Sequence, residues 1–201
     1  MNYLAHLSLS LDDPYIMMGN FIADEIAVRD IPKLPSRIMN GVRMHRLIDS
    51  FTDGHDAFKS SVKLFKGQHG GYAPVIVDII NDHFLSLNWS SYNAISFSQF
   101  EYHVYEAFDG LIDQIPSSAN SHVAALLNHR YLGVYQSKEG MKGVMKRMDR
   151  RTKFNSDFLS AVDHAYQHWE ALNENFIQLY SALLDVIATE SKTLLKDQPS
   201  K

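Results

Sequence analysis

Polar and apolar positions repeat at helical spacing along almost the whole chain. The alternation of β-branched and polar residues that is typical of half-buried strands is scarce. The clearest stripe lies between residues 155 and 195, where apolar residues recur at steps of three, four or seven: Phe158, Val162, Trp169, Leu172, Phe176, Leu179 and Leu183. The pattern predicts an all-α fold, a helical bundle that ends in one long C-terminal helix.

Residues that favour helix starts divide the rest of the chain. Asp13 before Pro14 predicts a capped helix start, and Ser96 with Gln99 has capping-box spacing. We expect the helix that follows residue 51 to be capped by Thr52 or Asp53. The segment from Gly133 to Gly143 is expected to be irregular. Further helices are expected to begin at three prolines: Pro35, Pro74 and Pro116.

The composition supports one domain. The chain has 201 residues and 45% hydrophobic content, which is enough for a single core, so we assign residues 1–195 to one domain and 196–201 to a frayed tail. The absence of cysteine excludes a disulfide framework, thiolate zinc sites and a cysteine nucleophile. No signal peptide or membrane span is evident, so we expect a cytoplasmic protein. The sequence does not determine the oligomeric state.

Positive charge is concentrated in one segment of an otherwise acidic chain. The formal net charge is −4, yet residues 142–153 carry six basic residues against one acid, Asp149. This distribution disfavours general nucleic-acid binding and favours docking of a locally acidic partner, although a solvated helix face explains it equally well. The candidate docking residues are Lys142, Lys146, Arg147, Arg150 and Arg151.

Two segments carry metal-ligand side chains at helical spacing. His45 and Asp49 are four residues apart, and so are Asp78 and Asp82, with His83 directly after. Residues four apart share one face of a helix. Facing helices that each offer such a pair can build a metal site in a helical core.

The candidate ligands combine carboxylates and imidazoles: His6, Asp24, His45, Asp49, Asp78, Asp82 and His83. This mixture suits Mn²⁺, Mg²⁺ or Fe²⁺, which can polarise a phosphoryl oxygen and lower the pKa of a bound water. Taken singly, each residue is better explained as a helix cap, an ion-pair partner or a packed core histidine. Buried carboxylates four apart repel each other, so the two pairs together favour a compensating cation.

Four segments of the chain together resemble the acyl carrier protein phosphodiesterases, also called acyl carrier protein hydrolases. They are Asn2 to His6, Gly19 to Asp24, Gly41 to Asp53 and Asp78 to Leu85. The segments keep the family's order and rough spacing, and the likeness extends to the C-terminal helix. It therefore covers nearly the whole chain.

The resemblance implies a fold distantly related to the HD-domain phosphohydrolases. It also implies hydrolysis of the phosphodiester between 4′-phosphopantetheine and a serine of holo acyl carrier protein, with Mn²⁺ as the metal. By motif position it points to Asp24, His45, Asp49, Asp78 and Asp82 as metal-site residues. The resemblance implies that four further residues orient these ligands or the water: His6, Asn20, Asp53 and His83. It also implies that Arg46 faces the phosphate.

Two other functions fit the same residues. An HD-like phosphohydrolase acting on a small phosphoester or nucleotide would use the metal site without the basic segment. A non-catalytic helical module could bind an acidic partner without any metal. A di-iron oxidoreductase is disfavoured because the Glu-x-x-His spacing of di-iron bundles is absent.

Overall fold

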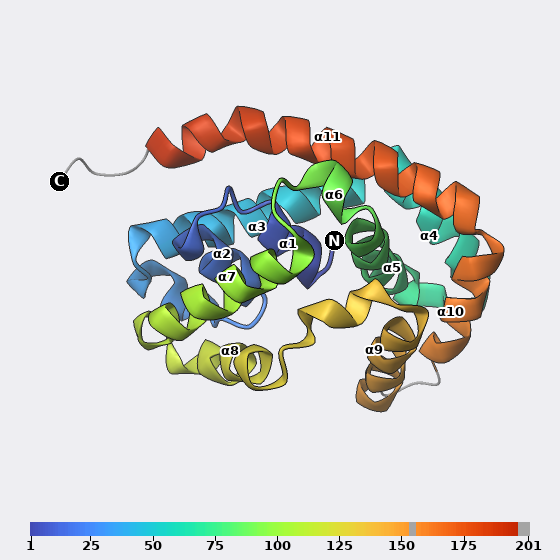
Figure 1. Cartoon of the computed structure of the whole chain (residues 1–201), viewed down its shortest axis with the longest axis horizontal. Coiled ribbons are helices and arrows are strands. Elements are labelled where there is room, and N and C mark those ends of the chain that lie inside the picture. Colours follow the sequence, from blue (N-terminus) through green and yellow to red (C-terminus); the bar gives the residue numbers. More distant parts are fainter. Residues whose placement is uncertain (153–155, 197–201) are drawn as a thin grey trace.

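The computed structural model describes residues 1–152 and 156–196, with side chains described to residue 190 (Figure 1). Every regular element within these residues is helical, which confirms the predicted all-α class. The α-helices are α1 (Tyr3–Ser8), α2 (Pro14–Ile22), α3 (Ser36–Gly54), α4 (Asp56–His69), α5 (Ala73–Leu87), α6 (Trp89–Tyr92), α7 (Phe97–Leu111), α8 (Ser117–His129), α9 (Lys138–Arg151), α10 (Phe158–Gln167) and α11 (Trp169–Lys196). The 3-10 turns are η1 (Val28–Lys33), η2 (Gly70–Tyr72), η3 (Ile112–Gln114) and η4 (Tyr131–Gln136).

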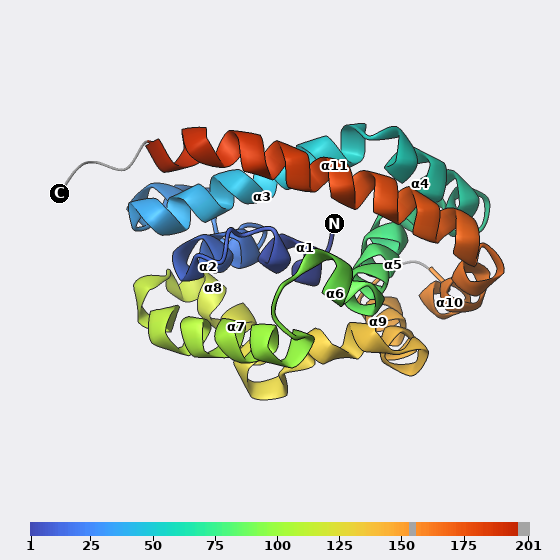
Figure 2. The same ribbon diagram turned by 45° about the horizontal axis from the view of Figure 1, so that its top comes forward.

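Helix α11 forms one long edge of the molecule and packs across α3, α4 and α5 (Figures 1 and 2). Helices α8 and α9 lie on the opposite side in Figure 1, with α1, α2 and α5 between the two edges. The core beneath α11 is aromatic. Phe176 of α11 stacks on Phe84 of α5 with ring centroids 5.9 Å apart, and both side chains are fully buried. The short helices α1 and α2 are thereby enclosed on both sides.

The helix starts predicted at Pro35, Pro74 and Pro116 are confirmed by α3, α5 and α8. Of the three predicted side-chain caps, two are confirmed and one is wrong. The Asp13 carboxylate accepts the backbone N–H groups of Tyr15 and Ile16 at 2.9 and 3.3 Å. Ser96 forms the expected capping box with Gln99. The expected cap at Thr52 or Asp53 does not exist, because α3 continues through both residues to Gly54. The side chain of His55 caps α4 instead, accepting the N–H of Ala57 at 3.2 Å.

The C-terminal helix is broken where one continuous helix was predicted. His168 leaves helical geometry (φ −111°, ψ 25°), so α10 ends at Gln167 and α11 starts at Trp169. The break lets α10 pack on α9 and α4 while α11 crosses α3. Predictions for Lys153, Asn155 and residues 197–201 lie outside the described residues. Within the part of the chain that the structure describes, neither α11 nor any other helix has the length and apolar character needed to cross a membrane.

The segment from Gly133 to Gly143 is more regular than predicted. Its first part belongs to η4 and its second part to α9, whose N-terminus is capped by Ser137 accepting the N–H of Gly140 at 3.0 Å. The basic residues from Lys142 to Arg151 therefore all lie on one helix.

Candidate metal centre

The centre depends on an unusually close crossing of α2 and α3, the most extensive helix pair in the fold. A Cβ atom at Gly19 would lie 1.8 Å from the carbonyl oxygen of Ile38, and one at Gly41 would lie 2.2 Å from that of Ile16. Only glycine permits backbones to meet at this distance. The crossing brings Asn20 of α2 against His45 of α3.

Two histidines from different helices lie face to face at this crossing. The rings of His6 on α1 and His45 on α3 stack with centroids 4.2 Å apart. Both rings direct Nε2 at Asp49, which lies one turn after His45. The Nε2 of His6 lies 3.1 Å from Oδ1 of Asp49, and the Nε2 of His45 lies 3.0 Å from Oδ2. The Nε2 of His45 also lies 3.2 Å from Oδ1 of Asp24, which follows α2 and is 79% exposed. The predicted His45–Asp49 pair thus gains His6 and Asp24 as neighbours.

Asn20 orients both rings. Its side-chain oxygen accepts a hydrogen bond from Nδ1 of His6 at 2.7 Å, and its backbone oxygen accepts one from Nδ1 of His45 at 2.8 Å. Its amide nitrogen donates to the carbonyl of His6 and to Ser10 Oγ at 2.7 and 3.0 Å. Because carbonyl oxygens only accept, both Nδ1 atoms carry hydrogen, and Nε2 is left for a ligand or a proton.

The charges of the centre are strongly coupled. Burial alone would lower the pKa of His45, but the carboxylates of Asp24 and Asp49 outweigh it and raise the pKa to about 9. Burial likewise opposes the ionised form of Asp49, but the two imidazoles lower its pKa well below the usual value. Burial lowers the pKa of His6. Without a metal, the proton on His45 therefore offsets one of the two carboxylate charges.

The residues fit a divalent ion. Among the described residues, His6, His45 and Asp49 form the one group of three whose ligand atoms all lie within 4.8 Å of one another. The Nε2 of His45 is buried without a well-aligned hydrogen bond. Nitrogen–oxygen separations of 3.0 to 3.2 Å suit neighbouring ligands of an octahedral ion about 2.1 Å from each. Mixed imidazole and carboxylate donors suit Mn²⁺, Mg²⁺ or Fe²⁺.

Helix α5 places Asp78 and Asp82 beside α1 instead of beside His45. The Asp82 carboxylate, fully buried, accepts the backbone N–H groups of Leu4 and Ala5 at 2.8 and 3.1 Å. Burial raises the pKa of Asp82 to about 7 despite these bonds. Asp78 Oδ1 lies 2.7 Å from the amino group of Met1. Both carboxylates thus fix the helix that carries His6, and their role as direct metal ligands stays a prediction.

The remaining candidates lie apart from the stacked histidines. His83 donates from Nδ1 to the carbonyl of Tyr135 and lies 3.3 Å from the hydroxyl of Tyr166. Arg46 and Asp53 are exposed on α3. Their catalytic or orienting roles also stay predictions. Ser10 and the glycine crossing were not predicted from the sequence. The pairing of Gly19 beside Asn20 with Gly41 one turn before His45 was the available signal for the crossing.

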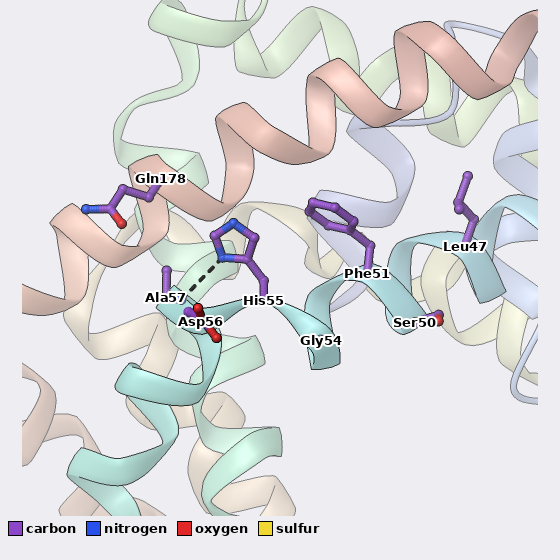
Figure 3. A pocket seen from close by; sticks show the side chains of 8 residues that line it. All are labelled: Leu47, Ser50, Phe51, Gly54, His55, Asp56, Ala57 and Gln178. Carbon is purple, nitrogen blue, oxygen red and sulfur yellow. Dashed lines mark hydrogen bonds between the residues drawn. The ribbon is translucent and has the colours of Figure 1, made fainter.

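A groove of about 630 Å³ lies next to α3 but away from these residues (Figure 3). It is bounded by Leu47, Phe51 and His55, with Gln178 of α11 opposite. Leu47 and Phe51 occupy the face of α3 turned away from His45 and Asp49, because two residues along a helix correspond to about half a turn. The groove is therefore not an entrance to the metal centre.

Comparisons with known proteins agree with the geometry. The family model described as acyl carrier protein phosphodiesterase matches residues 1–183. A relative with that description from Photorhabdus laumondii is 29% identical over 186 residues, covering 92% of this chain and 94% of its own. Relatives with that description from Escherichia coli and Yersinia pestis are 27% and 25% identical, covering 92% of this chain and 96% of theirs. No solved structure matches.

Proposed function

This chain belongs to the acyl carrier protein phosphodiesterase family, and from this premise we propose that it hydrolyses holo acyl carrier protein. The bond broken is the phosphodiester between the carrier serine and 4′-phosphopantetheine. Water adds to phosphorus, the serine oxygen leaves and takes a proton, and the products are apo carrier protein and phosphopantetheine. The observation that carries the proposal is the convergence of His6, His45 and Asp49 on one point.

We propose Mn²⁺ as the resident ion, with Mg²⁺ and Fe²⁺ as the alternatives that the donor set permits. His6 Nε2, His45 Nε2 and the Asp49 carboxylate would hold it, with Asp24 at the open edge. When bound, such an ion stabilises charge on a phosphoryl oxygen and lowers the pKa of a water. Asn20 keeps both rings in the tautomer that binding requires.

Asp24 is the residue best placed to move a proton during hydrolysis. It is largely exposed, so substrate and water can reach it, whereas Asp49 is half-buried between the rings. In the metal-free centre, the hydrogen bond with His45 lowers the pKa of Asp24. The exposed carboxylate of Asp24 is ionised at neutral pH with or without that bond, so it can accept a proton at Oδ2. Asp24 can return that proton to the departing serine oxygen.

Helix α9 supplies the surface for the carrier protein. Lys146, Arg147, Arg150 and Arg151 are exposed, whereas Lys142 is half-buried and lies 3.2 Å from the carboxylate of Glu139. A positively charged helix suits an acidic partner and speeds its association at low salt. The cytoplasmic location expected from the sequence is part of the same proposal.

The test is incubation with holo acyl carrier protein and Mn²⁺, followed by the carrier's mass. We expect a loss equal to phosphopantetheine, abolished by a chelator and by His45→Gln. Asn175→Ala, a change on α11 outside the centre, is the matched control and should act like the wild type. Hydrolysis of a small phosphodiester alone would favour the small-substrate phosphohydrolase. No hydrolysis of either would favour a binding module.

A further inference from the structure

A wall of aromatic side chains adjoins the exposed edge of the metal centre. Tyr3, one turn before His6 on α1, has its ring centroid 5.2 Å from those of Phe21 on α2 and His122 on α8, and 6.3 Å from that of Tyr131 in η4. Phe21 stacks on His122 at 4.5 Å. Four separate elements thus converge beside Asp24, which follows α2.

The wall contains an unused polar atom. The Nε2 of His122 is buried and has no hydrogen-bond partner, while its Nδ1 lies 3.9 Å from Glu25. Burial lowers the pKa of His122, so the ring is neutral near pH 7 and can accept or donate one hydrogen bond. Buried polar atoms without partners are uncommon and call for a ligand or another explanation.

One flank of helix α9 packs on η4, which carries Tyr131 of this wall. A Cβ atom at Gly140 would lie 1.9 Å from the carbonyl oxygen of Val134, so α9 meets η4 backbone to backbone. The opposite flank faces α10, where Lys138 lies 3.0 Å from Asp163 and its ammonium group lies over the ring of Tyr166. Arg147 and Arg151, four residues apart, share the flank of Gly140 and therefore face η4 and the wall.

The electrostatics of the wall agree with this placement. Burial raises the pKa of Tyr3 to about 12, and the nearby Arg151 guanidinium opposes the rise. Burial also raises the pKa of Tyr131, and both Arg151 and Arg147 oppose it. The carboxylate of Asp24 also raises the pKa of Tyr3. One tyrosine thus lies within electrostatic reach of both the metal centre and Arg151.

These two arginines form no ion pair in the described part of the chain, although the carboxylates of Asp24 and Glu25 act on the same rings as Arg151. No ion pair joins either of them to a carboxylate of residues 1–152 or 156–190. The acids of α9 are engaged elsewhere: Glu139 with Lys142, and Asp149 with the backbone N–H groups of Phe158 and Leu159. Two guanidinium groups four apart repel each other, so an anion between them is favoured.

We propose that Arg147 and Arg151, with the rings of Tyr3, Tyr131 and His122, form a binding site for the phosphate and adjoining alkyl chain of the substrate arm. This inference rests on the proposed function and divides α9 into two parts. The arginine pair recognises the prosthetic group, because guanidinium groups bind phosphate oxygens in a fixed fork and the rings cover the alkyl chain. Lys146 and Arg150 contact the carrier surface.

Binding of free 4′-phosphopantetheine, measured by calorimetry, tests the site without turnover. We expect Arg147→Gln/Arg151→Gln to weaken binding about 10- to 100-fold, the range for loss of charged hydrogen bonds. Lys63→Gln/Lys66→Gln removes two exposed charges from α4, outside every proposed site, and is the matched control. Thermal unfolding and Mn²⁺ titration check that both variants keep the fold and the centre.

Kinetics with holo carrier protein then separate the two parts of α9. We expect Arg147→Gln/Arg151→Gln to lower kcat/KM on the carrier and on a small phosphodiester, and Lys146→Gln/Arg150→Gln to raise KM for the carrier. Unchanged phosphopantetheine binding in the arginine variant would overturn the inference, whatever the turnover. A wild type that binds phosphopantetheine but leaves holo carrier protein intact would refute the proposed function while supporting the site.

Discussion

Replacing Asn20 with alanine tests whether this side chain orients the two histidine rings of the metal centre. The side chain is fully buried and makes three hydrogen bonds, two of them to His6. Its removal leaves the Nδ1–H of His6 without an acceptor, which costs about 1–3 kcal/mol of folding free energy. Loss of such an orienting partner weakens metal binding by about 10- to 100-fold, or about 1.4–2.7 kcal/mol.

The assay combines Mn²⁺ titration with urea unfolding of the metal-free protein. Asn20→Ala should lose both affinity and stability, because ring orientation and burial depend on the same bonds. Asn175→Ala is the control: it removes one hydrogen bond to Ser61 on α4 and should leave Mn²⁺ affinity unchanged. Wild-type affinity in Asn20→Ala, at a lower stability, would refute the argument that Asn20 selects the tautomer for metal binding.

Three further predictions concern the charge, the crossing and the anchoring of α9. In the presence of a chelator, the raised pKa of His45 stabilises the fold fully below about pH 6.5, and about 2–3 kcal/mol of this stabilisation is lost as the pH rises to about 9. Urea unfolding at several pH values should show this loss in the wild type but not in His45→Gln. The same dependence of stability on pH in both proteins would contradict the prediction. Gly41→Ala should separate α2 from α3 at a cost of about 1–3 kcal/mol or more and weaken Mn²⁺ binding, whereas Gly54→Ala, which meets open space, should do neither. Asp149→Ala should lower the melting temperature through a loss of about 1–2 kcal/mol, because it uncaps α10, and an effect no larger than that of exposed Asp163→Ala would disprove this role.

Local signals in the sequence predicted most of the helices. The caps at Asp13 and Ser96 depend on bonds between near neighbours, so a short window of sequence is sufficient to find them. The break at His168 could not be predicted in this way. The apolar stripe continues in register through it, and the bend depends on where α10 and α11 pack against distant helices.

The candidate site, too, could be predicted from the sequence only where its residues are close together in the chain. His45 and Asp49 share one helix face, and spacing alone placed them together. Asp78 and Asp82 have identical spacing, yet the structure directs both toward the residues that begin α1. Asp24, a candidate ligand by its residue type and motif position, lies in the turn that follows the end of α2 at Ile22. Spacing cannot distinguish a ligand pair from an anchoring pair, because both need buried carboxylates on one stripe.

The brevity of α1 has a consequence for folding order. A helix of six residues is too short to persist alone in water, so His6 gains its position only from contacts with residues far away in the sequence. Asp82 anchors α1 across an interval of 78 residues for Leu4 and 77 for Ala5. Contacts of such high sequence separation form after local helices have condensed. We therefore expect the metal centre to be completed late in folding, so that metal binding reports a finished native core.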